Sequence, residues 1–105
     1  MVSKRKLLLA VTLLLNMSAV PAEAETLQVT IDKMAFSPAT INSKVGDTIE
    51  WVNKDFLAHT ATVKGGWDVM IPAGKSASLV LKSAGTVQYY CRFHPNMKAR
   101  LTVKP

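Results

Sequence analysis

The stretch Cys91-Arg92-Phe93-His94-Pro95-Asn96-Met97 places a thiol, an imidazole and a thioether in one short turn, at the spacing C-x2-H-x2-M. These soft and borderline ligands suit copper in both of its common oxidation states. Trigonal copper sites of the blue type use two histidines, one cysteine and a weak axial methionine. The chain has one cysteine and two histidines, and the other histidine, His59, lies upstream. His59, Cys91, His94 and Met97 are therefore the candidate ligands of one copper ion.

The N-terminal segment predicts export. Residues 4–6 are basic, residues 7–20 are mostly apolar, and Ala22-Glu23-Ala24 has the A-x-A form of a cleavage site. We predict a secretory signal peptide over residues 1–24, removed after Ala24, and one mature domain over residues 25–105. An uncleaved membrane anchor is the alternative, but the apolar run is shorter than the ~20 residues that span a bilayer.

Export makes the single cysteine informative, because cysteines in an oxidising compartment are expected to pair. A lone Cys91 is a buried inert thiol, half of an intermolecular disulfide, or a metal ligand. His94 and Met97, at their spacing from Cys91, favour the metal ligand.

The chain is basic, with a formal net charge of +6. Residues 1–24 hold three basic residues and one acidic residue, so 10 basic and six acidic residues remain and the mature charge is +4. A basic surface suits nucleic acid, an anionic membrane or an acidic protein. Export argues against nucleic acid, and the lysines are scattered along the chain. We expect neither nucleic acid nor a membrane as partner after cleavage; a dedicated docking patch and a merely solvated basic surface both remain open.

From Thr26 onward, apolar and polar residues alternate with a period of two, which predicts short strands. Gly and Pro turns separate these segments, and this pattern is typical of an antiparallel sandwich. No segment has a sustained helical period, so we expect an all-β fold with at most one helical turn, near Trp67–Ile71. The predicted inward faces include Ile49, Trp51 and Asn53 in one strand, and Val87, Tyr89 and Cys91 in another. Cys91 then lies at the inward end of its strand.

The segment Trp51–Asp55, His59, the strand Gly85–Cys91 and the turn that follows together resemble the cupredoxin family. The short C-x2-H-x2-M turn is most similar to that of amicyanins, whereas plastocyanins and pseudoazurins have a longer interval between His and Met. The resemblance extends from about Thr26 to Lys104. It implies a Greek-key β-sandwich with one type 1 copper ion per chain.

The resemblance also implies a role for each ligand. His59 is the buried imidazole, Cys91 the thiolate, His94 the imidazole near the surface through which electrons pass, and Met97 the long axial ligand. In the family, the position of Asn53 links the His-bearing loop to the Cys loop. Met70 is a rival thioether, but it lacks the spacing of the turn, and we interpret it as packing.

The implied function is electron transfer by a copper protein that cycles between Cu(I) and Cu(II); the alternative is a copper-binding protein for transport or tolerance. We do not expect an enzyme, because both histidines are already used as ligands. We expect a monomer in the periplasm. By analogy, its partners are redox proteins, such as a c-type cytochrome or a dehydrogenase, docking near His94. The apolar residues that could surround His94 are Met34, Phe56, Leu57, Phe93 and Pro95.

Overall fold

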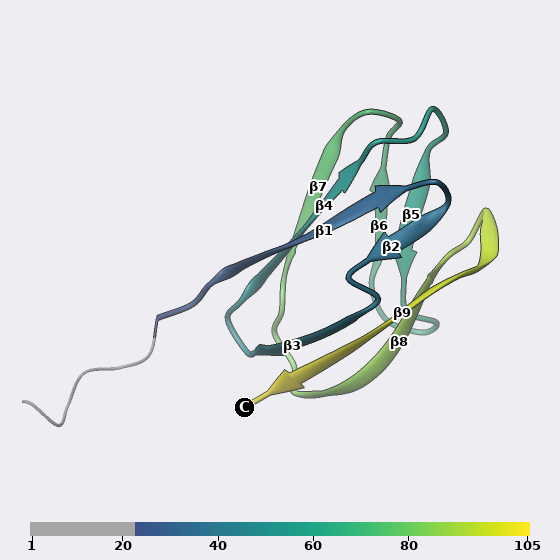
Figure 1. Cartoon of the computed structure of the whole chain (residues 1–105). Coiled ribbons are helices and arrows are strands. Elements are labelled where there is room, and N and C mark those ends of the chain that lie inside the picture. The colour runs from purple at the N-terminus through teal and green to yellow at the C-terminus, as the bar shows by residue number, and fades with distance from the viewer. Residues whose placement is uncertain (1–22) are drawn as a thin grey trace, which may run out of the picture.

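The computed structural model describes residues 23–105, which form two β-sheets packed face to face (Figure 1). One sheet has the order β2-β1-β4-β7 and the other β3-β9-β8-β5-β6. The strands are β1 (Thr26–Asp32), β2 (Ala35–Ser37), β3 (Thr40–Lys44), β4 (Thr48–Asn53), β5 (His59–Thr62), β6 (Asp68–Ile71), β7 (Ser76–Val80), β8 (Gly85–Cys91) and β9 (His94–Lys104). The predicted all-β sandwich is thus confirmed. Within residues 23–105, no helix is long and apolar enough to cross a membrane. The predicted signal peptide falls almost wholly outside the described residues.

Both sheets are mixed rather than purely antiparallel. β1 pairs with β4 in parallel, and β3 pairs with β9 in parallel. The other strand pairs are antiparallel. An alternating sequence determines which side chains share a face of a strand. The alternation does not indicate the direction of the neighbouring strand. The parallel orientation of these two pairs could therefore not be predicted from the sequence.

The core joins the two sheets through Trp51 of β4 and Tyr89 of β8. Both side chains are almost fully buried, and their ring centroids lie 5.7 Å apart. The indole Nε1–H of Trp51 donates to the hydroxyl oxygen of Tyr89 at 3.3 Å. Asn53 and Cys91 follow two residues later on the same inward faces, and both are buried as predicted. The core contact therefore sets the position of the strand ends that bear Asn53 and Cys91.

Tyr89 predicts a loss of stability at high pH. Burial of the phenol raises its pKa from 10.0 to about 12. Between these values only the unfolded chain releases the proton, so the free energy of unfolding should fall as pH rises above about 10. Urea unfolding at several pH values from 9 to 12 measures this fall. In Tyr89→Phe the fall should be smaller, although the variant is less stable at every pH because Trp51 loses its acceptor. An equal fall in both proteins would refute the prediction.

The helical turn expected near Trp67–Ile71 is wrong, because residues 68–71 form strand β6. This strand pairs antiparallel with β5, and His59 lies opposite Ile71. Ile71 is fully buried and Val69 half-buried, on the alternate positions of the strand. A four-residue segment is too short for its own pattern to decide between a turn and a strand. Residues 68–71 form a strand because they pair with the open edge of β5, and this pairing satisfies the backbone hydrogen-bonding groups of both segments.

Four connections meet at one end of the sandwich (Figure 1). They follow β1, β4, β6 and β8, and lead into β2, β5, β7 and β9. His59 begins β5 and Cys91 ends β8, so both candidate ligands belong to this end. We call it the site end.

Candidate metal centre

Cys91 is the last residue of β8 and is completely buried. The ladder between β8 and β9 shifts register between Tyr90 and Cys91, and Arg92 and Phe93 form the turn. This tight turn places His94, the first residue of β9, opposite Cys91. The C-x2-H spacing therefore corresponds to a hairpin turn that brings the second imidazole back to the thiol.

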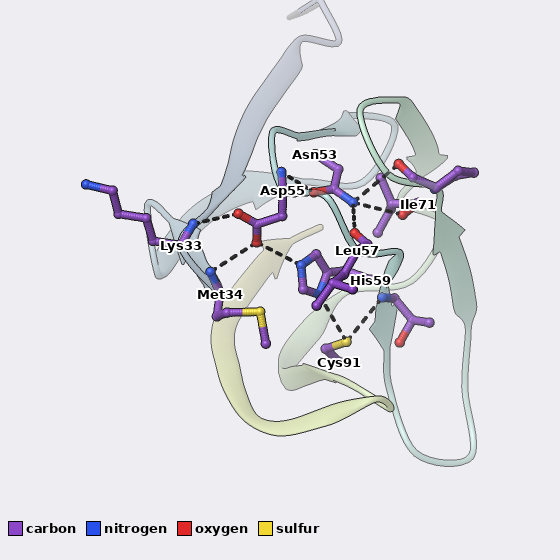
Figure 2. Close-up of polar contacts among 10 residues, drawn as sticks. Lys33, Met34, Asn53, Asp55, Leu57, His59, Ile71 and Cys91 are labelled. Atoms are coloured by element: carbon purple, nitrogen blue, oxygen red, sulfur yellow. Dashed lines mark hydrogen bonds and ion pairs between the residues drawn. The ribbon is translucent and has the colours of Figure 1, made fainter.

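His59, the first residue of β5, is also completely buried. Its Nδ1 lies 3.7 Å from Sγ of Cys91, and its Nε2 lies 2.8 Å from Oδ2 of Asp55 (Figure 2). An ionised carboxylate can only accept, so Nε2 carries the proton in this contact, and in the neutral ring the lone pair is then on Nδ1, which faces the sulfur. A hydrogen bond of this kind from the far ring nitrogen is what orients and fixes the tautomer of a metal-binding histidine.

The carboxylate of Asp55 links two segments of the site end, the turn after β1 and the first residue of β5. Besides His59, its carboxylate accepts the backbone N–H of Lys33 at 2.8 Å and that of Met34 at 3.0 Å. Lys33 and Met34 have positive φ angles of 52° and 62°, a conformation that L-residues rarely adopt without support. Burial acts to raise the pKa of Asp55, but the hydrogen bonds from Met34 and His59 outweigh it and lower this pKa. Asp55 thus stays ionised and holds the tight turn against the His59 ring.

Thr60 connects the histidine strand to the cysteine turn. Its backbone N–H donates to Sγ of Cys91 at 3.4 Å, and its hydroxyl oxygen accepts the N–H of Arg92 at 2.9 Å. The hydroxyls of Thr60 and Thr62 lie 2.9 Å apart, and Thr62 donates in turn to Asp68. This buried chain fixes the thiol relative to β5.

The link expected from Asn53 has a different partner. Its amide nitrogen donates to the carbonyl oxygens of Leu57 at 2.9 Å and Ile71 at 3.1 Å. Asn53 therefore ties the His59 loop to the end of β6, and Thr60 makes the connection to the cysteine turn. The expected kind of contact exists, but a different residue makes it.

Replacing Thr60 with valine should destabilise the fold by about 1–3 kcal/mol, because the Arg92 N–H and the Thr62 hydroxyl each lose a partner. Urea unfolding of the metal-free domain measures this loss. Thr60→Ser, which keeps the hydroxyl, is the matched control and should be clearly more stable than Thr60→Val. Equal stability of the two variants would show that the hydroxyl contacts contribute nothing.

His94 and Met97, the other two expected ligands, lie on β9, the strand that follows Cys91. His94 is half-buried, and its ring centroid lies 5.3 Å from that of His59. Met97 is 4% exposed and packs in the core with Cys91. A groove at the surface is lined by His94, Met97 and Met34. The second thioether at the site is thus Met34, whereas Met70 projects from β6 and is 46% exposed, in line with a packing or surface role.

The donor set fits a copper ion. Nitrogen and sulfur donors lie about 2.0 and 2.3 Å from a bound ion of this size. The 3.7 Å between Nδ1 of His59 and Sγ of Cys91 is therefore short enough for one ion to contact both. A thiol, two imidazoles and thioethers are the ligands that select copper over hard cations. The cluster of His59, Cys91, Met97 and Met34 is consistent with a type 1 copper site.

The residues expected to surround His94 are exposed. Phe56 is 101% exposed, Leu57 54%, Phe93 47% and Met34 39%. Pro95 is exposed as well. We call these five residues the apolar patch. Four of them come from three of the connections at the site end, and Pro95 is the second residue of β9. An apolar surface of this kind beside an imidazole edge is typical of an interaction site.

Comparison with known proteins agrees with this architecture. A family model described as a cupredoxin-like domain matches residues 6–103. Amicyanin of Paracoccus denitrificans is 31% identical over 86 residues, a match that covers 72% of this chain and 63% of that protein. Amicyanin-alpha of Methylorubrum extorquens is 30% identical over 90 residues, covering 79% and 76%. A solved structure of an oxidized amicyanin mutant has a TM-score of 0.70 at 29% identity, covering 83% of this chain and 88% of that one.

Proposed function

This chain belongs to the cupredoxin family, and we propose that it is a small electron-transfer protein that holds one type 1 copper ion through His59, Cys91, His94 and Met97. Amicyanin-like cupredoxins are electron carriers and not enzymes. The observation that carries the proposal is the buried pair of Cys91 and His59, in which Nδ1 faces the sulfur and Nε2 is held by Asp55. A copper ion bound there supplies a one-electron couple between Cu(I) and Cu(II).

The residues of the chain contribute a fixed frame to this couple. Cys91 and His59 are held by hydrogen bonds to Thr60 and Asp55, which belong to the protein itself. Ligands that are fixed by the scaffold need little rearrangement when the charge on the site changes. His94, which is half-buried, would offer its ring edge as the route to a partner, and the buried thioether of Met97 would be a weak ligand that adjusts the reduction potential.

We also infer that the protein is exported and processed after Ala24, so that residues 25–105 act in the periplasm as a monomer. The apolar patch is the docking surface for redox partners in this proposal, because three of its residues, Met34, Phe93 and Pro95, line the same groove as His94. A weak, rapidly exchanging contact suits an interface of this modest size.

The experiment that tests the proposal is the visible absorption spectrum of the 25–105 domain after addition of Cu(II). We expect an intense blue band, which ascorbate removes and ferricyanide restores. A colourless product would contradict the electron-transfer proposal. If such a product held Cu(I) very tightly and passed it to other copper proteins, the transport or tolerance alternative would replace it.

A further inference from the structure

Each of the four connections at the site end carries one exposed basic residue. These residues, which we call the basic rim, are Lys33, Lys54, Lys75 and Arg92. The three lysines form no ion pair within residues 23–105, and Arg92 pairs with Asp68. The rim lies around the apolar patch, since Lys33 adjoins Met34, Lys54 lies two residues before Phe56, and Arg92 adjoins Phe93.

The carboxylates at this end do not balance these charges. Asp55 is largely buried and already accepts three hydrogen bonds. Asp32, at the end of β1, is the one exposed carboxylate in the four connections and the strand residues that border them. Asp68, whose side chain is 47% exposed, balances Arg92, so the three lysines are what makes the accessible surface around the patch positive. The charges come from different connections, which is why they look scattered in the sequence.

We propose that the redox partner is a protein whose docking face carries carboxylates around an apolar centre, recognised by the basic rim. This proposal rests on the proposed function. Complementary charge accelerates encounter and orients the two proteins, while the patch provides close contact at His94. An anionic membrane would also attract lysines beside an exposed Phe56. A protein is the better occupant, because the patch includes residues that line the same groove as His94, the imidazole through which electrons would leave.

The test compares one-electron oxidation of the copper-loaded protein by two small reagents, anionic ferricyanide and cationic tris(phenanthroline)cobalt(III). With ferricyanide, the rate should fall about tenfold as ionic strength rises from about 0.01 to 0.15 M, and with the cobalt complex it should rise. In a variant with Lys33→Glu, Lys54→Glu and Lys75→Glu, both trends should reverse. The matched control changes Lys64, Lys82 and Lys104 to Glu at the opposite end. It has the same net charge as the first variant and should keep the original trends.

If both triple variants behaved alike, the overall charge and not the rim would govern encounter, and the proposal would be overturned. A measurement on the metal-free domain distinguishes a failure of the basic-rim proposal from a failure of the copper site. Poly-L-glutamate added to the isotope-labelled domain should shift the backbone NMR signals of the four connections. Shifts spread over the whole surface would contradict the rim even in a protein that binds copper. Binding to phosphatidylglycerol vesicles through Phe56, without shifts from polyglutamate, would replace the protein partner with a membrane.

An independent observation concerns Asp47, at the opposite end of the sandwich. Asp47 is 2% exposed, yet among residues 23–105 its carboxylate has only one charged partner, Nζ of Lys44 at 3.1 Å. Its other partners are the backbone N–H of Lys44 at 2.9 Å and that of Glu25 at 2.9 Å. The hydrogen bonds from Glu25 and Lys44 lower the pKa of Asp47, so it is ionised. A buried carboxylate needs such partners to offset its loss of hydration.

We infer that cleavage after Ala24 creates a buried ion pair, because it converts the Glu25 amide that faces Asp47 into an α-ammonium group. The carbonyl oxygen of Glu25 accepts the N–H of Thr48 at 2.8 Å, so the backbone beside this nitrogen is already held. Cleavage after Ala24 would then stabilise the mature fold, in addition to separating it from the signal peptide. This inference rests on the proposed cleavage position and not on copper.

A double-mutant cycle tests the pair. The 25–105 domain is prepared with a free or an acetylated N-terminus, each with Asp47 or with Asp47→Asn. Acetylation should lower Tm by about 4–8 °C in the parent domain and by much less in the Asp47→Asn variant. Equal losses in both backgrounds would overturn the inference. Should Asp47→Asn fail to fold, NMR titration of the Glu25 amine decides, since a pKa no higher than the usual value of about 8 excludes the pair. A mass of the exported protein that places its N-terminus elsewhere also overturns it.

Discussion

Replacing Cys91 with serine is expected to abolish the blue absorption band of the copper-loaded protein and to slow its electron transfer by orders of magnitude. Cys91 is the one side chain of the cluster that could supply a soft anionic donor, and its Sγ lies 3.7 Å from Nδ1 of His59. A serine hydroxyl remains protonated near neutral pH and is a hard ligand. The measurement is the visible spectrum after addition of Cu(II), together with the rate of reduction by ascorbate.

The control for this experiment is Met70→Leu, which removes an exposed thioether outside the cluster. It should keep the band and the rate unchanged. Far-ultraviolet circular dichroism of the serine variant checks that the sandwich still forms, since serine and cysteine have similar shapes. A folded Cys91→Ser protein that stays blue would rule out Cys91 as the copper ligand.

The alternation of side chains was sufficient to predict the inward faces of the longer strands. In β4, Ile49, Trp51 and Asn53 are all buried, as their period of two requires. In β8, Tyr89 and Cys91 are buried and Val87 is half-buried. These faces are local properties, because each depends on one strand and on the choice of which side meets the core.

Features that depend on a second segment were not accessible in this way. The parallel pairing of β1 with β4 depends on the path of the chain between them. Strand β6 forms because β5 offers an unpaired edge. In both cases the structure depends on pairing with another strand, and the residue pattern of one segment does not indicate that pairing.

In the candidate site, too, features local to one segment could be predicted, whereas contacts between distant segments could not. Cys91, His94 and Met97 are close in sequence, so their spacing alone pointed to one turn, and His59 was the one remaining imidazole. Asp55 was missed because its partners, Lys33 and Met34, are distant in the chain. A weak signal did exist, since Asp55 precedes His59 by four residues. Thr60 was missed because its hydroxyl bonds a backbone N–H, and such contacts have no residue-type signature.

Replacing Trp51 with alanine is expected to destabilise the domain by about 3–5 kcal/mol, the usual cost of removing a large buried aromatic side chain. Trp51 is 0% exposed and contacts the rings of Trp67 and Tyr89. Removal of the indole would leave a cavity between the sheets, and the Tyr89 hydroxyl would lose its hydrogen-bond donor. A domain of this size has a total stability of about 5–15 kcal/mol, so the variant should be marginally folded. Urea unfolding of the metal-free domain measures the loss.

Val80→Ala is the control, because Val80 is 49% exposed on β7 and its truncation should cost about 0.5 kcal/mol or less. The comparison also separates the scaffold from the metal. An ion that binds only the folded state adds stability by mass action, so copper should raise the unfolding midpoint of Trp51→Ala without restoring it to that of the parent. If copper restored it fully, metal binding rather than the Trp51–Tyr89 contact would be what holds β4 and β8, and with them the two sheets, in place at the site end. A cost below about 1 kcal/mol for Trp51→Ala, far under the usual range, would exclude this contact as the main link between the sheets.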